Sequence, residues 1–132
     1  MKKMKTTEIG KFGEEIATKF LKKRKFRIID RNIHLSHNEI DIIACLKKEK
    51  IIAFVEVKSR TVNEDLYSYF GSPASAVTKE KQARTAAAAK SYLRSTPRYK
   101  GFQPRFDVIE VYINKSDMTV LKINHIENAF GV

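Results

Sequence analysis

Cysteine, tryptophan and long apolar runs are nearly absent from this sequence. It has one cysteine, no tryptophan and three prolines in 132 residues, and no apolar run approaches the length of a membrane-spanning helix. The single thiol, Cys45, excludes an internal disulfide and suits a reducing compartment, where we expect it to fill space in the core. The basic segment 1–5 is not followed by the apolar stretch of a secretion signal. We therefore expect a soluble, cytoplasmic protein with no membrane span.

Acidic residues are also relatively few. The chain has 15 Asp and Glu residues against 26 Lys and Arg residues, which gives a formal net charge of +11. Such a surplus favours a polyanionic partner. The basic residues are spread over the chain rather than along one amphipathic helix, which favours nucleic acid over a membrane surface; an acidic protein is the remaining alternative. The length is typical of one domain, so we predict a single domain over residues 1–132 with a basic tail at residues 1–6.

The apolar periodicity predicts two helices and five strands in the order αβββαββ. The first helix is expected from about Thr7 to Arg24, and the second from an N-cap at Thr78 to Arg94. Strands are expected at residues 26–30, 40–46, 51–58, 106–113 and 118–123, with loops at residues 31–37, after Arg60 and between Pro97 and Pro104. A helix between two strands favours a parallel crossover, so we predict an α/β fold, a mixed sheet with helices on its faces.

The second and third predicted strands are separated by four polar residues, as in a β-hairpin. If Leu46 pairs with Ile51, the register places Asp41 opposite Glu56. The same register brings two more side chains to this face, Glu39 and Lys58. Facing carboxylates need a cation, a shared proton or a wider solvent gap, because like charges on opposite strands repel. The register therefore indicates a metal site or a structural ion-pair ladder, whereas a slip of one residue would turn Asp41 to the other face.

The predicted helices carry two further groups of interest. Small residues at positions 10, 13 and 17 flank the apolar stripe of the first helix and allow another backbone to come close. Glu14 lies beside them at the edge of the buried face, which makes it a candidate functional residue. The alternative is that Glu14 is an ordinary acidic residue on the helix surface. Lys79, Lys81 and Arg84 cluster near the start of the second helix, where they form either a solvated face or a phosphate-contacting face; the net charge favours the latter.

Three other groups have simpler interpretations. His34 and His37 lie in a predicted loop without thiols or a second ligand pair, which disfavours a zinc site. Three aromatic residues could either stack on bases or pack on the core: Tyr67, Tyr69 and Phe70. Asp107 and His125 are most simply residues that fix the ends of strands.

Further motifs run through nearly the whole chain: Gly10, Gly13-Glu14 and Ala17; Arg31-Asn32; Glu39-Ile40-Asp41; Val55-Glu56-Val57-Lys58 with Arg60; Gly71, Pro73, Ala76-Val77, Lys81 and Arg84; Arg105-Phe106-Asp107; His125-Ile126; and Asn128-Ala129-Phe130. Jointly they resemble the YraN family of uncharacterised proteins. That family looks like a member of the PD-(D/E)XK nuclease superfamily and is similar to archaeal Holliday junction resolvases. The usual glycine before Glu-Ile-Asp is Asn38 here, and asparagine tolerates positive φ better than most residues. The resemblance implies a restriction-endonuclease-like core.

The resemblance also implies a metal-dependent endonuclease that hydrolyses DNA phosphodiester bonds, on branched or distorted DNA if the likeness to resolvases extends to the substrate. Its implied catalytic residues are Glu14, Asp41, Glu56 and Lys58. Its implied ligands for Mg²⁺ or Mn²⁺ are Asp41, Glu56, the backbone carbonyl of Val57, and Glu14. Carboxylates and carbonyls are the hard oxygen donors that these ions prefer.

Contacts with nucleic acid are expected from four basic residues, Arg60, Lys79, Lys81 and Arg84. A homodimer is expected by analogy with junction resolvases, which cut two strands symmetrically. The alternative to a nuclease is a non-catalytic nucleic-acid-binding module that keeps the nuclease fold and the basic face.

Overall fold

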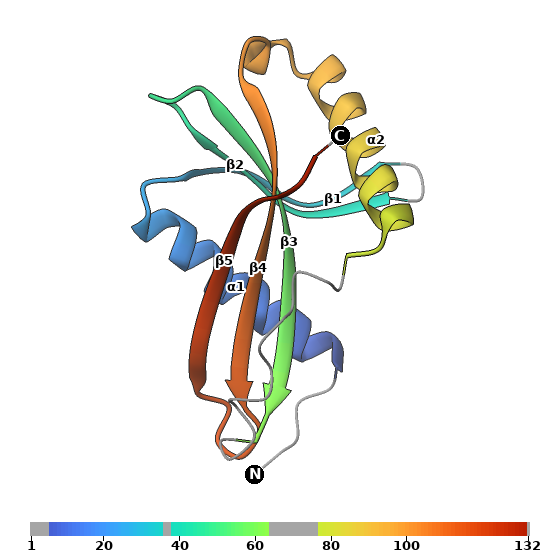
Figure 1. The fold of residues 1–132 in the computed structure, drawn as a ribbon. Coiled ribbons are helices and arrows are strands. Elements are labelled where there is room, and N and C mark those ends of the chain that lie inside the picture. The colour runs from blue at the N-terminus through green and yellow to red at the C-terminus, as the bar shows by residue number, and fades with distance from the viewer. Residues whose placement is uncertain (1–5, 36–37, 64–76, 132) are drawn as a thin grey trace.

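A computed structural model of the protein contains both predicted helices and all five predicted strands (Figure 1). The structure describes residues 6–35, 38–63 and 77–131. Its elements are α1 (Thr6–Lys23), β1 (Arg27–Leu35), β2 (Asn38–Leu46), β3 (Ile51–Val62), α2 (Lys79–Ser95), the 3₁₀ helix η3 (Pro97–Tyr99), β4 (Gln103–Asn114) and β5 (Val120–Phe130). Within the described ranges, neither α-helix is long and apolar enough to cross a bilayer.

The five strands form one sheet in the order β1-β2-β3-β4-β5. The pairs β1–β2, β2–β3 and β4–β5 are antiparallel, whereas β3 and β4 run parallel. The connection between the two parallel strands includes α2, as the predicted crossover requires. This mixed sheet in the order αβββαββ confirms the predicted α/β fold class and is consistent with a restriction-endonuclease-like core.

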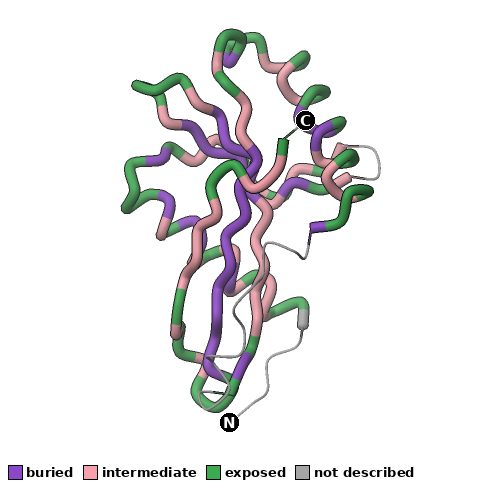
Figure 2. Tube along the Cα trace, viewed as in Figure 1, coloured by how far each residue is buried: buried purple, intermediate pink, exposed green. Residues whose placement is uncertain are grey.

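The two helices cover opposite faces of the sheet. Successive residues of a strand point to opposite sides, and α1 and α2 pack against different sets of them. On one face, Ala17 and Leu21 of α1 pack in a core with Val55 of β3. On the other, the buried alanines of α2 pack in a core with Phe54 and Cys45. Cys45 is a free, buried thiol, which confirms its expected place in the core. β4 lies between β3 and β5 and is buried along most of its length (Figure 2).

β1 includes residues that were expected in a loop. Arg31 and His34 pair with β2, and Asn32 lies between them in the same strand. A register shift between Ile28 and Asp30 and the positive φ of Asn32, 52°, interrupt the regular alternation that marks a strand in a sequence. The loop prediction was therefore wrong, because pairing with β2 stabilises an irregular strand that local periodicity does not reveal.

Other boundaries also differ from the prediction, most of all in β5, which was expected at residues 118–123 and runs from Val120 to Phe130. α1 begins at Thr6, inside the predicted tail, and β3 continues to Val62. The segment expected as a loop between Pro97 and Pro104 contains η3, and Pro104 itself lies in β4. Pairing with β4 extends β3 and β5 past their predicted ends, because it stabilises residues that local periodicity does not mark as strand. Two of the earlier candidates lie outside the described residues, His37 and the aromatic group at residues 67–70.

A buried polar network joins the start of β4 to β5. Asp107 accepts two hydrogen bonds from Arg105, each 2.9 Å long, and lies 2.8 Å from Nε2 of His125. The backbone N–H of Asn128 donates to the same carboxylate at 3.0 Å. Burial tends to raise the pKa of Asp107, but these hydrogen bonds outweigh it and hold the pKa below its usual value. Asp107 and His125 therefore have a structural role, as predicted, but the prediction that they fix strand ends was wrong: both lie inside their strands, where they join β4 to β5 beside a register shift.

α1 approaches β3 closely at a glycine. A Cβ atom on Gly13 would lie 1.8 Å from Oγ and 3.0 Å from Cβ of Ser59 on β3. A Cβ atom on Gly10 would meet nothing within 4 Å. Gly13 is therefore the small residue that this contact requires, and Gly10 is not.

We expect Gly13→Val to lower the free energy of unfolding by about 1–3 kcal/mol, because added volume in a packed contact forces its neighbours apart. Gly10→Val is the matched control in the same helix. It should change the free energy of unfolding by less than about 0.5 kcal/mol, since valine and glycine differ little in helix propensity. Urea denaturation measures both values, and equal stabilities for the two variants would contradict the close approach at Gly13.

Candidate active site

β2 and β3 separate where their acidic residues lie. Their antiparallel pairing begins at Leu46 and Ile51, which confirms the predicted register, and it ends one pair before Asp41 and Glu56. At that point the backbone N–H of Val57 donates to Oδ2 of Asp41 at 2.8 Å. The Asp41 carboxylate thus accepts the hydrogen bond that a backbone carbonyl of β2 would otherwise accept from Val57. The two acids that were predicted to face each other therefore lie where the strands are no longer paired.

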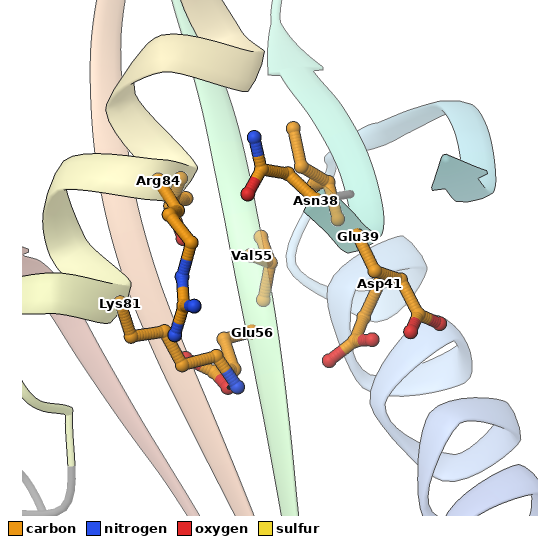
Figure 3. Close-up of a pocket in the computed structure, with 9 residues that line it drawn as sticks. Asn38, Glu39, Asp41, Val55, Glu56, Lys81 and Arg84 are labelled. Atoms are coloured by element: carbon orange, nitrogen blue, oxygen red, sulfur yellow. Dashed lines mark ion pairs between the residues drawn. The ribbon is translucent and has the colours of Figure 1, made fainter. Parts of the chain in front are cut away.

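A cavity of about 290 Å³ lies between these strand ends and α2 (Figure 3). Glu39 and Asp41 line it from β2, and Glu56 lines it from β3. Lys81 and Arg84 line it from α2, and Figure 3 shows the Lys81 side chain extending toward Glu56. Three carboxylates and two cationic side chains therefore border the same cavity.

Asp41 has the most strongly perturbed ionisation in the cavity. Burial raises the pKa of Asp41 to about 6, the hydrogen bond from Val57 opposes this shift, and three neighbouring acids add to it, Glu14, Glu56 and Glu39. Asp41 is therefore mostly ionised at neutral pH, but its charge is less stable there than that of an ordinary aspartate, and a cation close to it would stabilise the charge. Titratable groups in such surroundings are candidates for functional sites.

Glu56 has two cationic partners. The Nζ atom of Lys58 lies 3.6 Å from Oε1 of Glu56, and Lys81 forms an ion pair with the same oxygen. Lys58 follows Glu56 by two residues, so the period of the strand brings both side chains to one face, as predicted. The Lys81 contact joins α2 to β3, through two residues that lie 25 positions apart in the chain.

Glu14 lies apart from the cavity that Asp41 and Glu56 share. It borders a separate depression of about 320 Å³ together with Glu15 and Arg31, and Arg31 pairs with Glu15 at 2.8 Å. Burial raises the pKa of Glu14, the positive charge of Arg31 opposes this shift, and Glu39 adds to it. Its Oε1 atom is buried and has no hydrogen-bond partner within the described part of the chain. Glu14 is thus close enough to raise the pKa of Asp41, but it lines a different depression of the surface.

The four predicted nucleic-acid contacts are distributed over three places. Lys81 and Arg84 border the acidic cavity. Lys79 lines a different groove on α2. The Nε atom of Arg60 lies 3.8 Å from Oε2 of the fully buried Glu110, so Arg60 has a structural partner. The structure therefore brings two of these four basic residues to the candidate site.

The donor atoms of the site fit Mg²⁺ or Mn²⁺ in kind. Asp41 and Glu56 supply hard carboxylate oxygens, and Mg²⁺ is often held by one or two carboxylates with water and substrate phosphates completing its shell. The buried oxygen of Glu14, which lacks a hydrogen-bond partner among the described residues, is one further donor close enough to affect Asp41. Among the residues described, no three His, Cys, Asp or Glu side chains are gathered into a closed metal-binding group. An ion here would therefore depend on water or phosphate ligands as well.

Two features of the cavity did not follow from the sequence. Glu39 was placed on the correct face but was given no role, although it contributes to the raised pKa of both Asp41 and Glu14. The pairing of Lys81 with Glu56 was not predicted, and no local pattern indicates it. The N-cap at Thr78, which accepts from the Lys81 N–H at 3.2 Å, was the available signal that Lys81 lies in the first turn of α2.

We expect Asp41→Asn to be more stable than the wild type at neutral pH by about 1–3 kcal/mol. The pKa of Asp41 is raised in the folded state, so the folded protein holds its proton longer than the unfolded chain as pH rises. The wild type therefore loses stability relative to Asp41→Asn between about pH 4 and pH 6. Below that window the difference disappears. Thermal unfolding in EDTA across this pH range measures it.

Asp117→Asn is the control with the opposite sign. Hydrogen bonds from the Thr119 hydroxyl and N–H, 2.7 and 3.0 Å long, hold the pKa of Asp117 below its usual value. This variant should therefore be less stable than the wild type at neutral pH, and the difference should disappear as pH falls. A pH-independent difference between Asp41→Asn and the wild type would contradict the raised pKa of Asp41.

The sequence is similar to proteins from several bacteria. A model of the family described as "Uncharacterised protein family UPF0102" matches residues 13–111. A UPF0102 protein of Caldanaerobacter subterraneus is 44% identical over 131 residues, covering 98% of this chain and 100% of that protein. Another, of Caldicellulosiruptor saccharolyticus, is 42% identical over 127 residues, covering 96% and 100%. The resemblance to the YraN family is thereby confirmed, and the chain belongs to the uncharacterised protein family UPF0102.

Proposed function

We propose that this protein is a metal-dependent endonuclease that hydrolyses phosphodiester bonds in DNA. One observation carries the proposal: Asp41 and Glu56 border one cavity, with Lys58 beside Glu56 and the basic start of α2 on the other side. Phosphodiester hydrolysis uses both kinds of group, because carboxylates hold the metal ion and cations contact phosphates. The resemblance to PD-(D/E)XK nucleases supports the same assignment as an analogy of fold and motif.

Each predicted catalytic residue has a separate role in this proposal. Asp41 and Glu56 would hold Mg²⁺ or Mn²⁺ together with the carbonyl of Val57, and Glu14 would contribute through water or at a second ion. A bound ion of this kind polarises the scissile phosphate and acidifies a coordinated water. Lys58 orients the attacking water or stabilises the charge that develops on the phosphoryl oxygens.

DNA is the proposed substrate, and the cytoplasm is the proposed location. The net charge of +11 favours a polyanion, and Lys81 and Arg84 border the cavity where a phosphate backbone would enter. A preference for branched or distorted DNA rests on the likeness to junction resolvases. A homodimer rests on the same likeness, since a symmetric pair of sites would cut two strands.

A non-catalytic nucleic-acid-binding module is the second candidate, and one observation favours it. Lys58 and Lys81 both pair with Glu56, so the charge of this carboxylate is compensated without a metal ion. Such a module would bind nucleic acid through its basic residues and keep the acids as part of a structural ion-pair cluster.

We expect the purified protein to nick supercoiled plasmid or cut a synthetic four-way junction with Mg²⁺ or Mn²⁺, and to do neither in EDTA. Asp41→Ala and Lys58→Ala should each lower the cleavage rate by about 100-fold or more, a loss typical of removing one group that stabilises transition-state charge. Asp41→Ala should bind DNA at least as tightly as the wild type, because it removes an acid that repels phosphates. Gel electrophoresis measures cleavage, and fluorescence anisotropy measures binding.

Asp117→Ala and Lys115→Ala are matched controls for these two variants, since both residues lie in the turn between β4 and β5. Both variants should cleave at the wild-type rate. Binding without cleavage under every metal ion, together with weaker DNA binding by Asp41→Ala, would favour the binding module over the nuclease.

We expect Arg84→Ala to weaken binding to duplexes of any sequence, because Arg84 would contact a phosphate rather than a base. The slope of log Kd against log salt concentration should fall by about 1. Lys48→Ala removes an exposed positive charge from the turn between β2 and β3 and should leave the slope unchanged. Anisotropy titrations at several salt concentrations measure both slopes. Identical slopes for the wild type and Arg84→Ala would remove Arg84 from the interface.

A further inference from the structure

We propose that Lys81 is a displaceable cation, which neutralises Glu56 when no divalent ion is bound and is released toward a nucleic-acid phosphate when one binds. The proposal rests on the metal site of the proposed function. It adds a coupling between metal binding and nucleic-acid binding, with Lys81 as the residue that connects the two.

The contact that supports this proposal lies at a single carboxylate oxygen. Lys81 pairs with Oε1 of Glu56, and the Nζ atom of Lys58 lies 3.6 Å from the same oxygen. The Glu56 side chain is only 12% exposed, so its charge is partly desolvated and requires a nearby cation. One oxygen of a carboxylate that is proposed to hold a metal ion is thus already engaged by two ammonium groups. A divalent ion at Glu56 would compete with them for this oxygen, or repel them from the neighbouring Oε2 atom.

Lys81 is better placed to leave Glu56 than Lys58 is. The Lys81 side chain is 43% exposed, compared with 24% for Lys58. Lys58 lies on β3, whose backbone pairs with β4 on both sides of Glu56, so the strand keeps these two side chains together. Lys81 reaches Glu56 from a different element, through a flexible four-carbon stem that ends in a strongly hydrated ammonium group. Moving the Lys81 ammonium into water therefore requires no change in the backbone.

A divalent ion at Asp41 and Glu56 would reverse the field that Lys81 experiences. The ammonium group and the ion would repel each other at short range, because Coulomb energy rises as the distance falls. Arg84 borders the same cavity, so a released Lys81 would join a second cation at the place where a phosphate is proposed to enter. Metal binding should therefore strengthen DNA binding through Lys81, and DNA should strengthen metal binding by the same factor.

The first test is the affinity of the full chain for Mn²⁺ in the absence of DNA, measured by isothermal titration calorimetry. Lys81→Met should bind Mn²⁺ about twofold to fivefold more tightly than the wild type, the range expected when one partly exposed ion pair no longer competes. Lys90→Met is the matched control. It removes the same charge from the same helix, but Lys90 lines the groove on α2 that the candidate site does not share. Its Mn²⁺ affinity should equal that of the wild type.

The outcomes separate this proposal from the proposed function. Measurable Mn²⁺ binding with equal affinities for Lys81→Met and Lys90→Met would overturn the displacement of Lys81 and leave the nuclease proposal standing. An absence of Mn²⁺ binding in the wild type and in both variants would overturn the two proposals together.

The second test measures release toward phosphate, in a Lys58→Ala background that is expected to slow cleavage by about 100-fold or more, so that the duplex stays intact during the measurement. Fluorescence anisotropy gives the gain in affinity for a short duplex when Mn²⁺ replaces EDTA. This gain should be smaller with Lys81→Met than with Lys90→Met, by the factor seen in the calorimetry. Equal gains in the two variants would overturn the release of Lys81 toward phosphate.

Discussion

The parallel pairing of β3 with β4 is the contact on which the rest of the molecule depends. Every residue of β3 pairs with a residue of β4, and β4 is itself buried along most of its length. Because this edge of β3 is fully bonded, its other edge can leave β2 beyond Val55 without loss of order. That separation opens the cavity at Glu56 while the backbone of Val57 and Lys58 stays fixed. A rigid strand therefore presents the polar groups, as precise sites require.

The candidate site is rich in carboxylates, whereas the chain as a whole is strongly basic. A protein with a net charge of +11 brings together carboxylates from α1, β2 and β3. Asp41 is compensated only in part, by one backbone N–H within the described residues, whereas Glu56 is paired with two lysines. An acidic depression of this kind repels phosphates until a cation enters it, whereas the basic residues around it attract them. Binding of a cation and binding of a polyanion are therefore linked by charge alone.

Two aspartates of the same sheet show how a structural acid differs from a candidate functional one. Asp107 is buried, yet hydrogen bonds from Arg105, His125 and a backbone N–H stabilise its charge and lower its pKa. Asp41 receives one hydrogen bond and faces other acids, and its pKa is raised. The difference lies in how completely the protein satisfies each carboxylate. Asp107 therefore stabilises the junction of β4 and β5, whereas the charge of Asp41 is left only partly stabilised.

The sequence by itself determined the order of the elements, the parallel crossover and the hairpin register, because these follow from apolar periodicity and loop length. It did not determine the irregular β1, since a bulge breaks the pattern on which a strand prediction depends. Only the tertiary structure decided that Lys81 reaches Glu56 and that Glu14 lines a different depression from Asp41 and Glu56. Those distances depend on how α1 and α2 lie on the sheet, which is set by packing at positions such as Gly13 and the buried alanines of α2 rather than by any local signal.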